Sequence, residues 1–356
     1  MIKYKSKIIQ SDLEKINNDK FLAQIATGSK IMITGCNGMI ATYLLYYLLY
    51  LNDKYNKNLI IYAITRNLLK TKKKFDDLLL REDVKFIEHN VNLEFDFDIK
   101  ADYIFHLASS ADPRNILNNP VDIIKANTIG VINVMEYARR VNSRKVIFSS
   151  TREVYGKMDD KCCEVFEDSL GIIDQLSVRA CYPESKKMGE CIVNSYNLQY
   201  GIPYVIFRIA HTYGPGMPIS NDGRIMSDLI NNVVNRENII LKSDGSAVRG
   251  FLYISDLISG MMYATFVGDD NTVYNICNEE EDISVLDLAK KLIGLYPERN
   301  LDVSYKKISE QEKEAYCKFK RVMMNTDRLR KLGWSPKIKL NEGLQNTVNS
   351  YERNGE

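Results

Sequence analysis

A short stretch near the start of the chain, residues 30–41, most constrains the fold. It reads Lys-Ile-Met-Ile-Thr-Gly-Cys-Asn-Gly-Met-Ile-Ala, which predicts a buried strand, a glycine turn and an apolar helix through Leu51. Glycine lets the backbone approach a pyrophosphate closely, and the following helix presents free N–H groups and the positive end of its dipole. The spacing Gly-x-x-Gly-x-x-Ala departs from the commoner Gly-x-Gly-x-x-Gly. A glycine turn between a strand and a helix is common in proteins, so it indicates nucleotide binding only if the rest of the chain agrees.

Apolar segments of strand length recur downstream of this turn, at residues 59–64, 84–87, 103–107, 145–149 and 204–209. Segments with helical periodicity lie between them, notably residues 121–141 and 182–200. Strands that alternate with helices indicate an α/β fold with a Rossmann-type, doubly wound parallel sheet. Ligands of such sheets bind beyond the carboxyl ends of the strands, so the side chains that come after each strand form the candidate site.

The same pattern predicts a division of the chain. Residues 1–29 are expected to form a helical extension, and residues 30–211 a nucleotide-binding Rossmann domain to which residues 248–278 return. Glycines and prolines from Gly214 onward mark a crossing out of that domain, and a strand is expected at residues 251–254 in the returning segment. A smaller mixed α/β C-terminal substrate lobe is expected over residues 212–247 and 279–356.

Composition excludes several classes of protein. The net charge is only +2, whereas a nucleic-acid binder would have dominant or clustered basic residues. The seven cysteines are scattered and have neither the spacing of a zinc site nor that of a disulfide framework. No metal is therefore expected, and reduced thiols fit a cytoplasmic location. The apolar run at residues 39–51 is too short to span a bilayer, so no membrane partner is expected.

A tyrosine and a lysine stand at the start of the helix predicted over residues 182–200. Tyr182 and Lys186 are four positions apart and therefore share one helical face. An ammonium near a phenol lowers the phenol pKa and makes it a usable general base. Thr151, after the strand at residues 145–149, supplies a hydroxyl for hydrogen bonding to the reacting oxygen. A surface Tyr–Lys pair and a capping threonine are the structural alternatives.

These motifs together resemble the extended short-chain dehydrogenase/reductase family of nucleotide-sugar epimerases, dehydratases and decarboxylases. The resemblance covers residues 30–334 in order, and it includes Phe-His-Leu-Ala at 105–108, Asn-Thr-Ile-Gly at 127–130, Ser-Ser-Thr-Arg-Glu-Val-Tyr-Gly at 149–156, Tyr-Gly-Pro-Gly at 213–216, Arg-Gly-Phe at 249–251 and Leu-Gly-Trp at 332–334. It implies a catalytic triad of Thr151, Tyr182 and Lys186. It also implies a tightly held nicotinamide cofactor, a nucleotide-diphosphate-sugar substrate and a homodimer that pairs helices into a four-helix bundle.

Three segments resemble UDP-glucuronate decarboxylases more closely: residues 107–113, 179–182 and 221–224. The resemblance implies that Glu153 assists catalysis, and that Arg321, which lies thirteen residues before the closing Trp334, acts on the substrate. Arg152 departs from the pattern, since decarboxylases usually carry serine there and 4,6-dehydratases an aspartate that protonates the leaving hydroxyl. Arg152 therefore counts against dehydration. If the strand continues past Thr151, Glu153 faces the same side as Thr151.

The resemblance and the strand ends also give candidate binding residues. Those expected to contact the cofactor are Gly35, Asn37, Gly38, Met39, Ile40, Arg66, Asn90, Val91, Leu107, Ala108, Ser109, Asn127, Tyr182 and Lys186. Those expected to contact the substrate are Arg152, His211, Arg224, Arg249 and Arg321. For His106, a packing role is preferred.

Two questions stay open at this level. An NAD site usually has an acid at the end of the second strand, but Thr65, Arg66 and Asn67 stand there. NAD is expected because the relatives use it, and NADP is the alternative. The best single expectation for the reaction is decarboxylation after transient oxidation at sugar C4. A nucleotide-hexose 4-epimerase is the alternative enzyme, and a cofactor-binding regulator without turnover is the alternative from another class.

Overall fold

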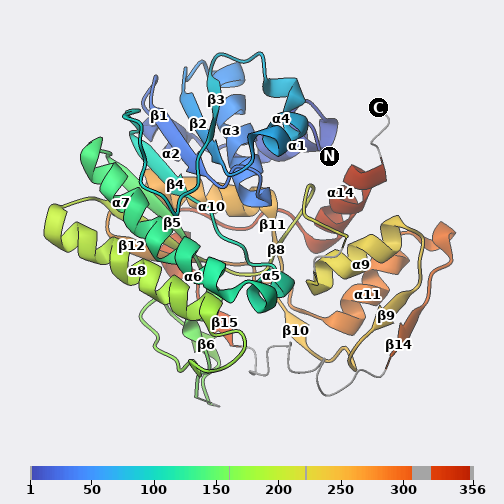
Figure 1. The fold of residues 1–356 in the computed structure, drawn as a ribbon. Helices are drawn as coiled ribbons and strands as arrows, with labels where there is room; N and C mark the ends of the chain where they lie inside the picture. The colour runs from blue at the N-terminus through green and yellow to red at the C-terminus, as the bar shows by residue number, and fades with distance from the viewer. Residues whose placement is uncertain (1, 160, 221–222, 307–321, 353–356) are drawn as a thin grey trace.

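The chain folds around one parallel sheet (Figure 1). The structure is a computed structural model that describes residues 2–159, 161–220, 223–306 and 322–352. Among these, the main sheet has seven strands in the order β12-β7-β5-β4-β1-β2-β3, and every neighbouring pair is parallel. In chain order the strands are β1 (Lys30–Thr34), β2 (Ile60–Thr65), β3 (Val84–Glu88), β4 (Tyr103–His106), β5 (Lys145–Thr151), β7 (Tyr204–Ile209) and β12 (Thr272–Ile276). The predicted fold class is confirmed.

Helices cover both faces of this sheet because successive strand residues point to opposite faces. On one face Ile31 and Ile33 pack with the apolar helix α3 (Met39–Tyr55) and with α10 (Ile254–Phe266). On the other face Met32 and Phe148 pack with α7 (Ile129–Arg140) and α8 (Cys181–Tyr200). The apolar residues of these helices therefore make two core layers with the sheet between them.

Shorter elements lie around the sheet. The remaining helices near it are α1 (Lys7–Ile16), α2 (Asp19–Gln24), α4 (Leu68–Lys74), α5 (Pro113–Asn118) and α6 (Pro120–Asn127), with 3₁₀ turns η1 (Asp76–Leu78) and η2 (Arg152–Tyr155). The first two, α1 and α2, precede β1 and contact α10, and α1 also contacts α3. Within the described ranges no helix is both long and apolar enough to cross a membrane.

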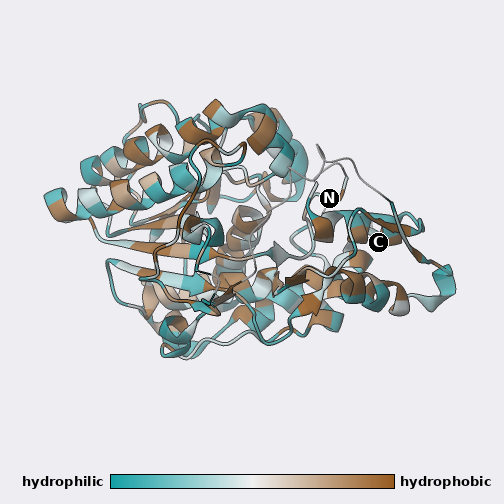
Figure 2. Cartoon of the chain, turned by 90° about the horizontal axis from the view of Figure 1, so that it is seen from below, coloured by the Kyte–Doolittle hydropathy of each residue, from teal (hydrophilic) through white to brown (hydrophobic). Residues whose placement is uncertain are grey.

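Further helices and two-stranded ladders lie outside the main sheet, most of them to the right of it or below it in Figure 1. The helices are α9 (Ile225–Val234), α11 (Val285–Gly294), α13 (Asp327–Arg330) and α14 (Leu340–Glu352), with the 3₁₀ turn η3 (Pro297–Arg299). The ladders pair β8 (Thr212–Tyr213) with β11 (Leu252–Tyr253), β9 (Ile239–Leu241) with β14 (Val303–Tyr305), β10 (Val248–Arg249) with β13 (Ile283–Ser284), and β6 (Glu164–Val165) with β15 (Met323–Met324). Helices α9, α11 and α14 contact one another, and their buried apolar residues belong to the same core cluster as those of β1, α3 and α10. Figure 2 shows hydrophobic residues, in brown, both around the sheet and in the helices to its right.

Two local predictions differ from the structure. The helix expected over residues 121–141 is divided at Thr128 into α6 and α7, which also begin and end slightly differently. The strand expected at residues 251–254 is the short β11, and it pairs with β8 outside the main sheet. The segment that does join the sheet from this part of the chain is β12, paired with β7.

Candidate active site

The glycine turn after β1 lies against the end of β4. Gly35 has φ +72°, a conformation that favours glycine, and a Cβ there would lie 2.8 Å from the Ala108 Cα. Gly38 is the N-cap of α3 and offers no side chain to its first N–H groups. Met39 and Ile40 form the first turn of that helix. The open N-terminus and the close backbone approach are what a pyrophosphate needs.

A cluster of amide and hydroxyl groups takes the place of the usual acid after β2. The Asn37 Nδ2 donates to the Thr65 Oγ1 at 2.9 Å and to the Thr71 Oγ1 at 2.8 Å. The Lys74 Nζ lies behind the turn and donates to the Asn37 carbonyl oxygen at 2.8 Å. Burial lowers the pKa of Lys74 to about 8. Arg66 is exposed, and its role in binding is still a prediction.

Unpaired acceptors lie along the same edge of the sheet. The Asn37 Oδ1, the Ser109 Oγ and the Asn127 Oδ1 are buried without a hydrogen-bond partner among the described residues. Leu107 and Ala108 donate their N–H groups to the Thr34 Oγ1 at 3.1 and 3.2 Å, which fixes the backbone that carries Ser109. Buried polar atoms are normally paired, so these atoms fit a polar ligand laid across the strand ends.

Asn90 and Val91 come after β3 at this edge. The Asn90 Oδ1 accepts from the Asn92 N–H at 3.2 Å, and the Val91 carbonyl oxygen accepts from the Asn133 side chain at 2.9 Å. The two residues are therefore held by a local turn and by α7. Together with the glycine turn, they fit the cofactor that the sequence predicts.

The three proposed catalytic side chains are buried. Thr151 ends β5 and is 6% exposed, while Tyr182 and Lys186 in α8 are 6% and 3% exposed. The Lys186 Nζ donates to the Ser149 carbonyl oxygen at 2.6 Å, so the lysine joins α8 to the end of β5. Thr151 also makes a hydrogen bond with Tyr182. The predicted Thr–Tyr–Lys set is thus brought to the carboxyl end of one central strand.

Burial acts on both ionisable members of this set. Burial is the largest influence on Tyr182 and raises the pKa of the phenol, and the Glu153 charge raises that pKa further. The hydrogen bond with Thr151 lowers it, as do the charges of Arg179 and Arg224. Burial also lowers the pKa of Lys186 to about 7. The net direction for Tyr182 is therefore opposite to the lowered pKa that the sequence argument expected, because that argument left out desolvation.

Glu153 does not lie on an extended strand. Strand β5 ends at Thr151, and Glu153 belongs to the 3₁₀ turn η2, where its N–H donates to the Thr151 Oγ1 at 3.3 Å. Because the strand has already ended at Thr151, Glu153 and Thr151 do not share a strand face. The Glu153 carboxylate accepts from Arg179 at 3.2 and 3.3 Å, and its charge raises the pKa of the Tyr182 phenol.

The predicted substrate residues occupy different surroundings. Arg152 donates to the Val322 carbonyl oxygen at 3.3 Å, and its charge lowers the pKa of Asp282 against the effect of burial. Arg224 caps α9 and acts electrostatically on Tyr182. His211 is exposed, with its ring centroid 5.9 Å from that of Phe251.

Two further predicted site residues and one packing residue complete the set. Arg249 lies in β10 and donates to the Val248 carbonyl oxygen at 2.8 Å. Arg321, expected to be catalytic and substrate-binding, lies outside the described residues, as do Asn221 and Asp222 of the third resembling segment. His106 is 2% exposed and its Nδ1 lies 2.8 Å from the Thr34 Oγ1, in keeping with the packing role preferred for it.

Three supporting residues were not predicted from the sequence. Arg179 pairs with Glu153. Ser185 accepts from the Asn127 Nδ2 at 2.9 Å and donates to the Tyr182 carbonyl oxygen at 3.1 Å, which ties α6 to the first turn of α8. Gly189 lets α8 approach the sheet, since a Cβ there would lie 2.6 Å from the Phe148 ring. The one feature of the sequence that could have indicated all three is that they lie within seven residues of Tyr182.

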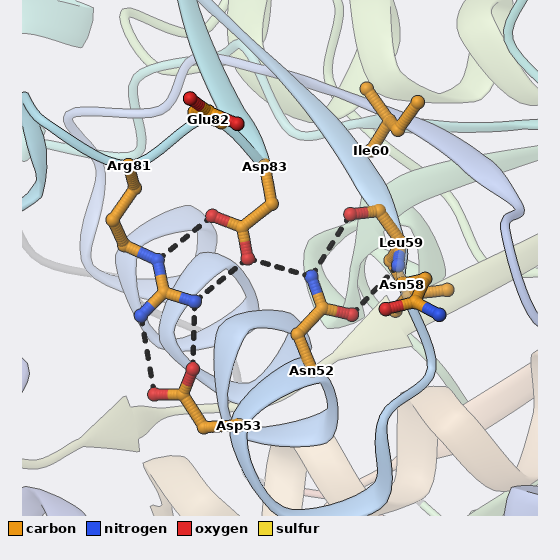
Figure 3. Close-up of a pocket in the computed structure, with 8 residues that line it drawn as sticks. All are labelled: Asn52, Asp53, Asn58, Leu59, Ile60, Arg81, Glu82 and Asp83. Carbon is orange, nitrogen blue, oxygen red and sulfur yellow. Dashed lines mark hydrogen bonds and ion pairs between the residues drawn. The ribbon is translucent and has the colours of Figure 1, made fainter.

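A separate pocket lies at the opposite, amino-terminal end of the strands (Figure 3). Its polar side chains bind one another: the Arg81 guanidinium pairs with Asp53 and Asp83 at 2.8 and 2.7 Å, and Asn52 donates to Asp83 at 2.8 Å. The charges are thus already satisfied within the protein, and this end of a parallel sheet is not where ligands bind. The strand ends around Gly35, Thr151 and Tyr182 remain the candidate active site.

The chain resembles known proteins of one family. Residues 31–277 match the NAD dependent epimerase/dehydratase family. The chain is 32% identical over 331 residues to UDP-glucuronic acid decarboxylase 6 of Arabidopsis thaliana, which covers 92% of this chain and 90% of that protein. It is 30% identical over 337 residues to UDP-glucuronic acid decarboxylase 1 of Xenopus tropicalis, which covers 94% and 74%.

Solved structures share the fold at lower identity. UDP-glucose 4-epimerase from Thermotoga maritima has a TM-score of 0.76 and 22% identity, covering 92% of this chain and 100% of that one. UDP-glucuronic acid 4-epimerase from Bacillus cereus has a TM-score of 0.75 and 23% identity, covering 91% and 99%. Both therefore have the Rossmann-type sheet and the smaller C-terminal part seen here.

Proposed function

The chain belongs to the NAD dependent epimerase/dehydratase family, and from that premise we propose that it is an NAD-dependent UDP-glucuronate decarboxylase. It is a nucleotide-sugar modifying enzyme, and its relatives at 30–36% identity are named UDP-glucuronic acid decarboxylases. The observation that carries the proposal is the buried set of Thr151, Tyr182 and Lys186 at the carboxyl end of β5. The alternative within the family is a 4-epimerase.

Two groups of residues would hold the cofactor. The turn at Gly35 and Gly38 would bind the pyrophosphate, and the buried acceptors of Asn37, Ser109 and Asn127 fit hydroxyl and amide donors of the nucleotide. When bound, NAD would supply the oxidation of the sugar at C4 and its reversal within one turnover. The amide and hydroxyl cluster at Asn37 and Thr65 would replace the usual acid at the ribose.

Tyr182 would take the proton from the sugar 4-hydroxyl. Its raised pKa means that the phenolate needs positive charge nearby. Arg179 and Arg224 are cations that lower that pKa, and Lys186, one helical turn along α8, is proposed to add to their effect. Thr151, hydrogen-bonded to Tyr182, would hold the reacting oxygen in line with the phenol.

Loss of carbon dioxide would result from the substrate's own chemistry. A ketone at C4 lies β to the carboxylate on C5, so the electrons of the broken carbon–carbon bond delocalise into the ketone. The chain then has to deliver a proton to C5, and Glu153, whose charge acts on Tyr182, is proposed as the acid or base that relays it. Arg152, Arg224 and Arg321 are proposed to contact the substrate, as are His211 and Arg249.

The direct test is incubation of the purified protein with UDP-glucuronate. We expect release of carbon dioxide and a sugar-nucleotide product lighter by one CO₂. Mass spectrometry would follow the product, and the same measurement would be made across a panel of UDP-, dTDP-, CDP- and GDP-sugars. A product equal in mass to its substrate, with the 4-hydroxyl inverted, would contradict decarboxylation and establish the 4-epimerase. No change in any sugar, with nicotinamide bound, would favour a regulator without turnover.

We also propose a homodimer formed through α6, α7 and α8. These helices pack together on one face of the sheet (Figure 1) and expose apolar side chains on their outer surface: Val121, Ile124, Ile129, Ile132 and Met188. Pairing of two copies would bury that surface in a four-helix bundle. Light scattering at micromolar concentration should give twice the chain mass of 40.9 kDa.

A charged substitution tests the surface itself. Met188→Glu places a carboxylate on the exposed face of α8 and should shift the protein toward monomer while its circular dichroism is unchanged. A wild-type protein that is monomeric would contradict the proposed dimer. The division into Rossmann domain and substrate lobe, and the cytoplasmic location, stay predictions.

A further inference from the structure

A buried ion pair lies one helical turn beyond the proposed catalytic lysine. Glu190 in α8 accepts from Arg208 of β7 at both carboxylate oxygens, 3.0 Å from the Nε and 2.7 Å from the Nη2. Each side chain of the pair is 13% exposed. The Ser150 Oγ also donates to the Glu190 Oε1. The carboxylate is therefore fixed from the strand that carries Thr151 and from the next strand of the sheet.

The arginine is itself held from several sides. Its Nη1 donates to the Glu167 carbonyl oxygen at 2.8 Å, and its guanidinium carbon lies 4.9 Å from the centre of the Tyr155 ring. The Tyr155 hydroxyl donates to the Asn275 Oδ1 at 2.6 Å. These contacts join β5, β7 and β12, so Glu190 cannot turn away without breaking a network that spans three strands.

Lys186 has few other charges around it. On its own helix stand Tyr182 and Glu190; from β4 comes His106, whose own pKa is lowered to about 3 by burial first and then by the Lys186 charge. From β5 come the Ser149 carbonyl oxygen and the Phe148 ring, whose centre is 4.8 Å from the Nζ. Arg208 of β7 comes next to this neighbourhood through its ion pair with Glu190.

Within this neighbourhood Glu190 opposes the effect of burial on the lysine. Burial lowers the pKa of Lys186, and the Glu190 charge raises it. Arg208 offsets part of that charge, since it is bound to both carboxylate oxygens. A neutral His106 adds no charge of its own.

We propose that Glu190 is a positioning residue for the proposed catalytic lysine: held by Ser150 and Arg208, it keeps Lys186 protonated at the end of β5. The inference rests on the proposed roles of Lys186 and Tyr182. In the proposed mechanism a charged Lys186 favours the Tyr182 phenolate, so Glu190 would act on the base through the lysine and not by contact with substrate. Arg208 would set how strongly it acts.

The role of Glu190 predicts the direction in which the pH dependence of activity should shift in each variant. Activity that needs a protonated Lys186 is present below the lysine pKa and is lost as pH rises through it. Glu190→Gln removes the opposing charge, so the alkaline limb of the kcat profile should move to lower pH by about 1 unit. Glu190→Asp keeps the charge and should keep the limb nearer the wild-type position. Arg208→Gln leaves Glu190 uncompensated and should move the limb to higher pH.

A second readout needs no substrate. In protein grown with labelled lysine, the side-chain resonance of Lys186, assigned by comparison with Lys186→Met, should titrate at lower pH in Glu190→Gln and at higher pH in Arg208→Gln. Equal midpoints in wild type and both variants would overturn the proposal, as would shifts of the same sign in both. The expected shifts without turnover of any sugar nucleotide would support the role of Glu190 and count against the proposed function. If Glu190→Gln does not fold, the Arg208→Gln and Glu190→Asp midpoints decide.

Discussion

Replacing Tyr182 by phenylalanine is expected to lower turnover by about 10²–10⁴-fold, the usual loss when a general base is removed. The phenol is buried beside Thr151 and is the proposed acid–base group at the end of β5. Phenylalanine fills the same volume in the cluster that Tyr182 forms with Ile116 and Ile123, so the fold should persist. Initial rates with UDP-glucuronate and the absorbance of bound nicotinamide would be measured on the same preparation.

A matched control comes from another buried tyrosine. The Tyr47 hydroxyl donates to the Asn17 Oδ1 at 2.9 Å on the far side of α3, away from the strand ends. Tyr47→Phe should cost roughly 1 kcal/mol of stability for one lost hydrogen bond and leave kcat nearly unchanged. Turnover of Tyr182→Phe near the wild-type rate, with cofactor bound, would remove Tyr182 from the proposed mechanism.

The strands of the main sheet were predictable wherever they were apolar and continuous. The first six lie within two residues of the expected bounds because buried parallel strands have apolar runs that few other elements share. The seventh strand, β12, reads Thr-Val-Tyr-Asn-Ile. It was not predicted because its polar residues interrupt the apolar run that would indicate a buried strand. Asn275 is fully buried there, held by Tyr155 and Asn325. Only tertiary hydrogen bonds make that position suitable for a strand.

The site could be predicted where residues adjacent in sequence act together. Gly35 with Gly38, and Tyr182 with Lys186, each lie within one turn, so their spacing carries the geometry. The link between Glu190 and Arg208 crosses from a helix to a strand, and no periodicity indicates it. The same holds for Lys74, which reaches back to the carbonyl oxygen of Asn37. Such pairs depend on how β2, α4 and β7 pack, which composition and spacing do not determine.

The Tyr182 pKa shows a second limit, because the spacing of two charged groups says nothing about how deeply they are buried. Counting the nearby ammonium gave a lowered phenol pKa, whereas burial raises it. Desolvation disfavours the charged forms of tyrosine and lysine alike. The proposed enzyme therefore depends on the surrounding cations and on Glu190 to favour the pair in which Lys186 carries the proton.

Substituting alanine for Gly35 is expected to lower the free energy of unfolding by roughly 2–5 kcal/mol, from a left-handed backbone and an overpacked contact together. The residue has φ +72°, and its Cβ would lie 2.8 Å from the Ala108 Cα, 3.1 Å from the Ala108 nitrogen and 3.2 Å from the Leu107 carbonyl oxygen. These are backbone atoms of the loop that carries Ser109. Relief of the clash would push that loop away from the turn, so nicotinamide absorbance should also be lost from the purified protein.

The neighbouring glycine separates this clash from a general intolerance of side chains in the turn. Gly38 has φ −68°, and a Cβ there would meet only the Gly35 carbonyl oxygen at 3.3 Å. Gly38→Ala should therefore cost about 1 kcal/mol, the value for a poorer N-cap. Urea unfolding of the two variants measures the difference. Equal stabilities would mean that the contact between β1 and the end of β4 does not require glycine at position 35, and the turn would then be explained by cofactor approach alone.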